Sequence, residues 1–160
     1  MSSNAKPDTF RYLSEPKNIQ NRCIFCKIAH GEIKPGGKNN PQELLFENER
    51  IVAFHDISPG AKFHILIIPK RHLKNCWDLT PDLLNEMEDI ANDLLQKKNI
   101  ENESTTMFFI RPPWNSVFHV HLHAMILPLT DSFWSLRRLG YTNPWFHVTP
   151  FELRMHWEST

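Results

Sequence analysis

The sequence predicts an α+β domain, in which an antiparallel sheet packs against one long helix. Two observations support this prediction. Short apolar segments rich in β-branched residues are separated by turn-forming residues, as in a sheet of short strands. Only one segment, which begins at Thr80, shows sustained helical periodicity. Strands and helices do not alternate, which argues against a parallel sheet built from βαβ units.

The chain divides into three parts. Residues 1–20 are polar, contain two prolines and are expected to form a flexible N-terminal tail. The domain is placed at residues 21–128 and is expected to open with a short helical segment. Residues 129–160 form a C-terminal extension rich in aromatic side chains. Such an extension is expected to pack on the domain or on the partner in a dimer.

Within the domain, each predicted strand is a short apolar segment that ends at a turn or a proline. The long helix is predicted from Thr80, with Pro81 in its first turn, through Leu95, because apolar residues recur at helical spacing over this range. The predicted strands cover residues 44–46, 51–54, 64–69 and 107–110.

The segment 117–127 alternates between histidines and apolar residues over its first half. In a strand, side chains alternate between the two faces, so His119, His121 and His123 are predicted to stand in a row. One interpretation is a polar strand edge. Convergent titratable groups instead favour a functional site, either catalytic or metal-binding. A metal site is also open, because histidines two residues apart on a strand can share a cation.

Charge and cysteine content limit the class of protein. Lys plus Arg and Asp plus Glu are each 18, and the resulting zero net charge argues against extended nucleic acid as a partner. No segment resembles a signal peptide or a membrane span. The odd set Cys23, Cys26 and Cys76 then indicates a reducing compartment, so we expect a cytoplasmic or nuclear protein without a membrane association. There, a Cys-x-x-Cys pair binds metal more often than it forms a disulfide.

Four blocks of sequence resemble the histidine triad family, and in particular its nucleotide-binding Hint-type branch. The resemblance covers roughly residues 22–128. The blocks are, in order, Cys23-Ile-Phe-Cys-Lys-Ile28, Ile51-Val-Ala-Phe-His-Asp-Ile-Ser-Pro59, His64-Ile-Leu-Ile-Ile-Pro-Lys-Arg-His72 and Ser116-Val-Phe-His-Val-His-Leu-His-Ala-Met125.

The resemblance implies a small α+β domain that pairs as a homodimer and reacts at the α-phosphate of nucleotides. It implies that His121 attacks phosphorus to form a nucleotidyl-histidine, which water then opens. Neutral imidazole is a suitable nucleophile at cellular pH. His119 and His123 would polarise phosphate oxygens or protonate the leaving group, and Ser116 would lie near that group. No cofactor is required for this chemistry.

The resemblance also implies a site for purine nucleoside monophosphates. Asp56 would accept hydrogen bonds from the ribose hydroxyls, although a turn aspartate is the simpler interpretation of this residue alone. Apolar residues would enclose the base, with core packing as the alternative for each. The other implied nucleotide-binding residues are Phe25, Phe54, His55, Ile57, Asn115 and Val117.

A structural zinc site is a further implication. Cys23, Cys26, His72 and His119 resemble the two cysteines and two histidines that bind zinc in some members of the family. Such a set closes a tetrahedron and leaves no position for a catalytic water. The alternative is two buried free cysteines.

The leading hypothesis is a hydrolase that cleaves adenosine 5′-monophosphoramidates or acyl-adenylates. Two alternatives remain: an aprataxin-like enzyme that removes adenylate from nucleic-acid ends, and a non-enzymatic adaptor that binds nucleotide or zinc. The sequence also departs from the family pattern. Some relatives have a histidine just before the proline pair, where this chain has Phe109-Ile110-Arg111, which puts an accessory role of that histidine in doubt. Trp114-Asn115 replaces a common Gly-Gln, which puts the leaving-group preference in doubt.

Overall fold

The computed structural model describes residues 22–98, 102–130 and 143–159. The predicted N-terminal tail therefore lies outside the described residues. In the described part of the chain, no helix is both long and apolar enough to cross a membrane.

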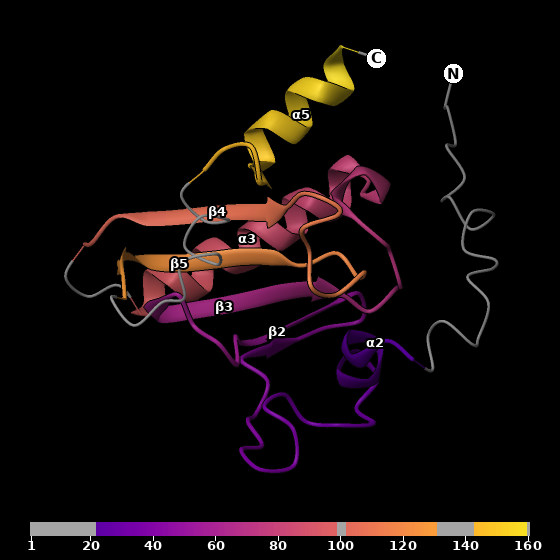
Figure 1. Ribbon diagram of the computed structural model, residues 1–160, viewed down its shortest axis with the longest axis vertical. Helices are drawn as coiled ribbons and strands as arrows, with labels where there is room; N and C mark the ends of the chain where they lie inside the picture. The colour runs from indigo at the N-terminus through magenta and orange to yellow at the C-terminus, as the bar shows by residue number, and fades with distance from the viewer. Residues whose placement is uncertain (1–21, 99–101, 131–142, 160) are drawn as a thin grey trace, which may run out of the picture.

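A six-stranded antiparallel sheet forms the centre of the molecule (Figure 1). Its order is β1-β2-β3-β5-β4-β6, so β3 and β5 occupy the middle. The prediction of an α+β fold on an antiparallel sheet is confirmed. The strands are β1 (Phe46–Glu47), β2 (Ile51–His55), β3 (Ala61–Pro69), β4 (Thr105–Ile110), β5 (Leu122–Leu129) and β6 (His147–Val148).

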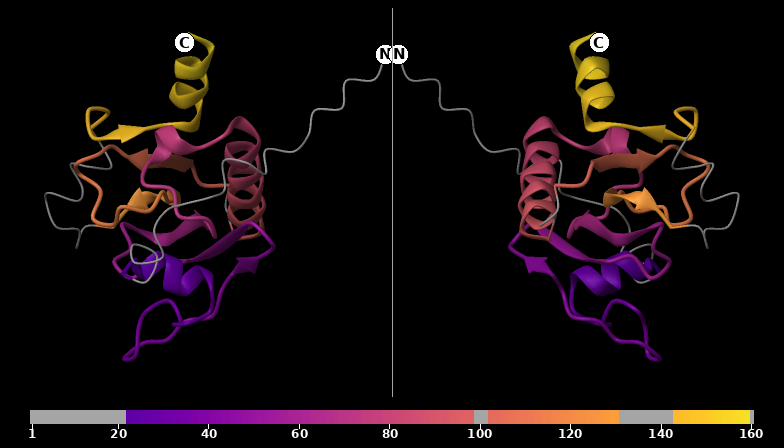
Figure 2. Two further views of the ribbon diagram at one scale, coloured as in Figure 1. Left: turned by 90° about the vertical axis from the view of Figure 1, so that its right-hand side faces the viewer. Right: turned by 90° about the vertical axis from the view of Figure 1, so that its left-hand side faces the viewer.

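Helices pack on both faces and at one end of this sheet. The long helix α3 (Pro81–Lys98) lies along one face (Figure 2). It begins with Pro81 and ends in basic side chains that complement the helix dipole, as the sequence indicates. The short helix α2 (Ile24–Ala29) lies near β2, and α5 (Pro150–Glu158) stands beyond β4. A short 3-10 helix covers Cys76–Asp78.

Alternate residues of β3 point into two different apolar clusters. Ile65 and Ile67 belong to the large core beneath α3. Leu66 and Ile68 belong to a smaller cluster that includes Phe25 of α2. This is the period of two expected of a strand that is covered on both faces. The sheet thus separates the main core from the face on which α2 packs.

The described part of the C-terminal extension packs on its own domain. Strand β6 pairs with β4, with Val148 opposite Phe109. Helix α5 begins with a capping box at Thr149, and Arg154 reaches α3, where it donates to Asn85 (2.7 Å) and pairs with Glu88. Three of the aromatic residues that make the extension rich in such side chains lie outside the described residues: Phe133, Trp134 and Tyr141.

The prediction that residues 117–127 form one strand is wrong in its first part. Strand β5 begins only at Leu122, opposite Ile67 of β3. The residues just before Leu122 do not pair with β3 and make other hydrogen bonds. The N–H of Val120 donates to the carbonyl of Leu73 (2.7 Å), and the ring of His119 donates to the carbonyl of Pro69 (2.9 Å). The first two triad histidines therefore lie in an irregular segment, and only His123 lies on the strand.

Candidate active site

A cavity of about 550 Å³ opens on the α2 face of the sheet. His121 and His123 line this cavity, and so does Asp56, which directly follows β2 and has Oδ2 4.0 Å from Nδ1 of His123. Most of the remaining lining is apolar. A concave apolar site with a few convergent polar groups is the usual form of a small-molecule site.

One ring nitrogen of His121 is held by the backbone. The Nδ1 atom lies 2.7 Å from the carbonyl oxygen of His119. A carbonyl can only accept, so Nδ1 carries the hydrogen and Nε2 carries a lone pair. Burial lowers the pKa of His121 to about 4, which keeps the ring neutral near pH 7. The residue therefore has the tautomer and charge state of a nucleophile.

The tautomer of His123 is set by a residue that sequence analysis missed, His64 on β3. The backbone N–H of Gly60 donates to Nδ1 of His64 (2.9 Å), which places the hydrogen of His64 on Nε2. That Nε2 lies 2.9 Å from Nδ1 of His123 and 3.5 Å from Oδ2 of Asp56. His123 thus accepts at Nδ1 and carries its own hydrogen on Nε2. The sequence offered one signal for this role, a histidine at the start of the otherwise apolar run 64–69.

The same hydrogen bonds argue against a cation among these side chains. Asp56, His64 and His123 bring potential ligand atoms within 4.8 Å of one another. A histidine needs a lone pair to coordinate a metal. Because Gly60 donates to Nδ1 of His64, the nitrogen that faces the group carries a hydrogen. This cluster is therefore arranged as a hydrogen-bonded chain.

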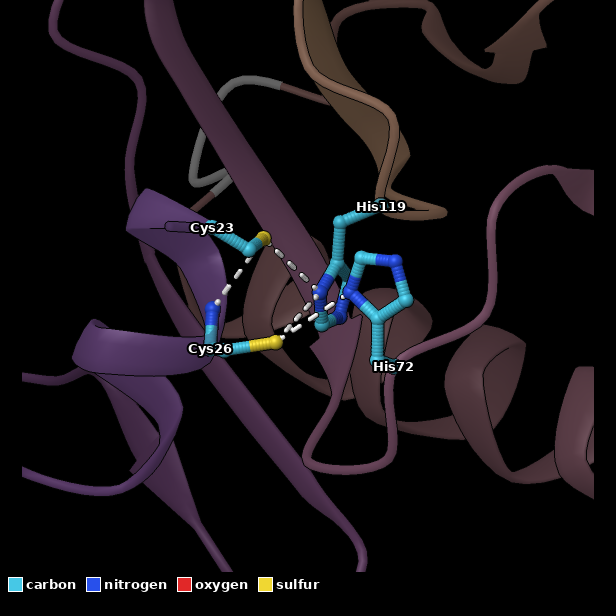
Figure 3. Close-up of side chains that lie close together, drawn as sticks. All are labelled: Cys23, Cys26, His72 and His119. Atoms are coloured by element: carbon cyan, nitrogen blue, oxygen red, sulfur yellow. Dashed lines mark hydrogen bonds between the residues drawn. The ribbon is translucent and has the colours of Figure 1, made fainter. Parts of the chain in front are cut away.

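His119 turns away from the cavity and joins the cysteines instead (Figure 3). Its Nδ1 lies 3.4 Å from Sγ of Cys23 and 3.4 Å from Sγ of Cys26. His72 completes the group, with Nδ1 3.2 Å from Sγ of Cys26. All four ligand atoms lie within 4.8 Å of one another, and they come from three distant parts of the chain.

The chemistry of this group fits a tetrahedral cation such as zinc. Nε2 of His119 donates to the carbonyl of Pro69, which leaves the Nδ1 lone pair directed at the sulfurs. Metal-bound histidines usually make such a second hydrogen bond. A hydrogen bond from Cys26 lowers the pKa of Cys23, while that of Cys26 is raised. The pair therefore already favours one thiolate.

The residues implied for nucleotide binding gather at one end of the cavity. Phe25 packs edge-on against Phe54, with ring centroids 5.8 Å apart, and against His121 at 5.1 Å. Asp56 is only 8% exposed, and its Oδ1 accepts the N–H of Ser58 (2.8 Å). This hydrogen bond is the interaction expected of a turn aspartate, which was the alternative interpretation of Asp56. A carboxylate has further acceptor sites that face the cavity.

Most of the predicted catalytic and nucleotide-binding residues therefore line a single cavity. Two do not: His119 faces the cysteines, and the side chain of Asn115 donates to the carbonyl of Val117 (3.2 Å). The predicted residues that line the cavity are Phe25, Phe54, His55, Asp56, Ile57, Ser116, Val117, His121 and His123.

Comparisons with known proteins agree with this geometry. Residues 22–138 match the family model described as "Scavenger mRNA decapping enzyme C-term binding". The mouse protein named adenosine 5′-monophosphoramidase HINT3 is 35% identical over 148 residues, which cover 88% of this chain and 84% of the mouse protein. The chain belongs to the histidine triad family. Its Hint-type relatives place it in the nucleotide-binding branch that the sequence motifs indicate.

Solved structures of histidine triad proteins share the fold. A hydrolase of the family from Legionella pneumophila is 34% identical, with a TM-score of 0.56, and the match covers 71% of this chain and 98% of that one. A histidine triad protein from Mycobacterium smegmatis, described as zinc-bound, is 22% identical with a TM-score of 0.58; it covers 72% of this chain and 82% of its own. The second likeness concerns the fold alone. From its family and relatives, the present protein is an enzyme, a hydrolase that acts on nucleotides.

Proposed function

We propose that this enzyme hydrolyses adenosine 5′-monophosphoramidates and acyl-adenylates through a covalent nucleotidyl intermediate on His121. The observation that supports this most directly is the bond from Nδ1 of His121 to the carbonyl of His119, which leaves Nε2 as a nucleophile in the cavity. The mouse relative is named for the first of these two activities.

The reaction has two displacements at phosphorus. The Nε2 lone pair of His121 forms a bond to phosphorus as the bond to the leaving nitrogen or oxygen breaks. The leaving group keeps the bonding electrons and takes a proton, for which the Nε2 hydrogen of His123 and the hydroxyl of Ser116 are suited. Water then attacks phosphorus and the bond to His121 breaks, so that AMP leaves. One proton of that water restores the donor.

The nucleoside is placed at the α2 end of the cavity. Phe25 and Phe54 offer apolar ring surfaces to a purine base, with Ile57 at the mouth of the cavity. Asp56 lines the same cavity, with Oδ2 4.0 Å from Nδ1 of His123, so its carboxylate is available to accept the ribose hydroxyls of a nucleoside bound there.

Turnover of an adenosine phosphoramidate by the purified protein tests this function. We expect release of AMP and free amine. His121→Ala should lower kcat by about 10³-fold or more, because the covalent route is lost. His156→Ala, a surface histidine on α5, is the control and should turn over like the wild type.

Two further measurements sharpen the test. Acid quench during turnover of labelled substrate should trap nucleotide on the wild type and none on His121→Ala. A 5′-adenylated DNA nick should be a poor substrate. Faster turnover of the nick than of the phosphoramidate would instead favour the aprataxin-like alternative.

We also propose that Cys23, Cys26, His72 and His119 hold a structural zinc ion. The four ligand atoms and the Pro69 carbonyl behind His119 support this. When bound, zinc would supply a cross-link between α2 and the segment that carries the triad, and four protein ligands would leave it no water to activate.

Pairing of two copies stays a proposal, supported by exposed apolar side chains on the C-terminal extension such as Trp145 and Phe151. Light scattering would then give about twice the 18.9 kDa of one chain. A location in the cytoplasm or nucleus also stays a prediction.

A further inference from the structure

The cluster formed by Cys23, Cys26, His72 and His119 is joined to the cavity by two routes. The first route is His119 itself. Its ring faces the sulfurs, with Nδ1 3.4 Å from Sγ of each cysteine, while its carbonyl oxygen accepts from Nδ1 of His121 (2.7 Å). One residue therefore contacts the cysteines with its side chain and fixes the tautomer of the nucleophile with its backbone.

Phe25 provides the second route, because it lies between the two cysteines in the chain and lines the cavity. Its ring packs edge-on against the rings of His119 (centroids 6.0 Å apart) and His121 (5.1 Å). It also meets Phe54 in the apolar wall proposed to receive the purine base. A change in the first turn of α2 therefore displaces an aromatic ring that borders both the nucleophile and the base.

The two thiols of α2 differ in exposure and lie close together (Figure 3). Cys23 is half-buried and caps the helix, whereas Cys26 is only 2% exposed. Sγ of Cys23 accepts the backbone N–H of Cys26 (3.5 Å), and the two sulfurs lie within 4.8 Å of each other. Cysteines three residues apart on one helical turn have the Cα separation that a disulfide accepts. Closure therefore needs side-chain rotation and a small adjustment of the first turn.

On the basis of the proposed function, we infer that Cys23 and Cys26 form a peroxide-sensitive modification site whose disulfide weakens the nucleotide site through His119 and Phe25. The more accessible sulfur, that of Cys23, reacts first, and the buried sulfur of Cys26 resolves the product.

A peroxide is the oxidant in this reaction. Sγ of Cys23 bonds to one peroxide oxygen as the O–O bond breaks, which gives a sulfenic acid and releases water or, from an organic peroxide, an alcohol. Sγ of Cys26 then attacks that sulfur, the S–O bond breaks, and the oxygen leaves as water. The two thiols lose two electrons and two protons, and the peroxide gains both.

The disulfide changes what the cluster can hold. A thiolate coordinates metal and a disulfide does not, so the oxidised pair cannot hold the zinc ion proposed above. The ring of His119 is then held by the hydrogen bond from its Nε2 to the carbonyl of Pro69 and no longer by the sulfurs. Closure also shifts the turn that carries Phe25. The carbonyl that orients His121 and the ring that borders the base both become less well fixed.

Treatment of the full chain with hydrogen peroxide tests the site, with mass spectrometry, zinc release and AMP binding as measurements. We expect the peptide that contains both cysteines to become two hydrogen atoms lighter and zinc to be released in parallel. The Kd for AMP should rise by about tenfold. Dithiothreitol with added zinc should reverse all three changes, because thiols reduce a disulfide but do not reduce methionine sulfoxide.

Cys76→Ala is the matched control, because this thiol is buried outside the cluster. It should respond to peroxide as the wild type does. Cys26→Ala lacks the resolving sulfur, so peroxide should cause no change in AMP affinity that dithiothreitol reverses. Thermal melting verifies that each variant is folded, and the reversal in the wild type decides the matter even if Cys26→Ala does not fold.

A measurement that needs no nucleotide separates the two claims. In protein with isotope-labelled histidine, the Nδ1–H signal of His121 reports its hydrogen bond to His119, and it should shift when the disulfide forms. If the reduced protein neither binds AMP nor hydrolyses a phosphoramidate, the proposed function fails, and this signal alone decides the link to His121.

Two outcomes would overturn the inference while the proposed function stands. In the first, the disulfide forms but the AMP affinity and the His121 signal both stay unchanged. In the second, methionine sulfoxide accumulates while Cys23 and Cys26 form no disulfide.

Discussion

At the scale of single residues, the partner of each imidazole nitrogen determines what each histidine can do. His121 and His119 each donate to a backbone carbonyl, but through opposite ring nitrogens, Nδ1 in the first and Nε2 in the second. The nitrogen left with a lone pair therefore faces the cavity in His121 and the cysteines in His119. Two residues of one motif acquire different chemistry from two carbonyl groups.

The orientation of His64 leads to a prediction about positioning. His64→Leu removes both the acceptor for Gly60 and the donor to His123, so the His123 tautomer is no longer fixed. We expect kcat to fall by about 10²-fold with little change in KM. His64→Gln should recover much of this loss, because an amide can accept from Gly60 and donate to His123. Single-turnover kinetics with melting curves would check this, and equal losses in both variants would show a packing role instead.

Asp56 gives a prediction about ribose recognition. Competition between AMP and its 2′,3′-dideoxy analogue should favour AMP clearly in the wild type, since unpaired polar groups penalise the analogue. In Asp56→Asn the preference should shrink, while an amide oxygen can still accept the N–H of Ser58 and keep the turn. Inhibition constants for both nucleotides measure this. Equal constants in the wild type would remove Asp56 from the ribose site.

Sequence reasoning could identify the triad residues but not their separate roles. The motif at residues 116–125 is local, whereas the groups that orient its rings, Pro69 and His64, lie 50 and 59 residues away in the chain from the histidines they contact. His64 was missed because it begins an apolar run and its position matches a buried strand residue. Its burial is real, but so are its polar contacts.

At the scale of elements, α2 depends on its surroundings. It has six residues, too few for a stable isolated helix, and its N-cap is the sulfur of Cys23. Apolar packing of Phe25 and Ile28 and the cluster of cysteines and histidines hold it against the sheet. Because Phe25 also contacts His121, the placement of α2 bears directly on the cavity.

The cluster therefore leads to a prediction about metal content. Protein purified without added metal or chelator should contain about one zinc ion per chain, and its removal should lower Tm, since the binding free energy of a structural metal contributes to folding. Cys26→Ala should lose the metal. Cys76→Ala is the control: its thiol is buried outside the cluster, and burial raises its pKa to about 11. Elemental analysis decides the matter, and a metal-free wild type with an unchanged Cys26→Ala melting curve would leave only buried thiols.

The N-terminus of α5 gives a prediction that depends on pH. The hydroxyl of Thr149 accepts the N–H of Glu152 (3.2 Å), and the backbone N–H of Thr149 donates to the Glu152 carboxylate (2.7 Å). Thr149→Ala should lower the free energy of unfolding by about 1 kcal/mol. The hydrogen bonds that the backbone N–H and the hydroxyl of Thr149 donate to the Glu152 carboxylate lower the pKa of Glu152 below its ordinary 4.5. Its stabilisation is therefore complete above pH 4.5 and lost as pH falls through the folded value.

Denaturant unfolding at pH 7 and pH 3 measures this effect. The difference between wild type and Glu152→Gln should be larger at pH 7. Glu158→Gln, at the other end of the same helix, should show no such dependence. An equal effect of Glu152→Gln at both pH values would contradict the capping role of the charge.

Long or strongly patterned elements were predictable, and short ones were not. Helix α3 and strands β2 and β3 lie where periodicity places them, within a few residues. Strand β6 has only two residues and exists because the edge of β4 is available to it. Strand β5 starts later than its alternating pattern indicates: its pairing with β3 ends at Ile67 and Leu122, and the carbonyl of Pro69, the last residue of β3, accepts from the ring of His119 instead.

At the scale of the whole molecule, the sheet separates two tasks. The large core lies beneath α3 and contains no triad residue, whereas the cavity lies on the opposite face. The amino-acid composition argues against extended nucleic acid as a partner, but it cannot show that the core and the cavity lie on opposite faces of the sheet. It follows from the alternation of side chains on β3 and β5, which send Leu122 and Ala124 to the core and His123 to the cavity.

The sheet order also bears on how such an enzyme can diverge. His64 and His123 lie on β3 and β5, the two central strands, and His121 directly precedes β5, while Trp114 and Phe146 lie on connecting segments beside the edge. Substitutions in loops usually perturb stability less than substitutions in a central strand. Gene duplicates can therefore vary these connecting segments repeatedly and acquire new substrates without first rebuilding the reaction centre. In this arrangement, the central strands preserve the reaction, and substitutions in the connecting segments change the choice of substrate.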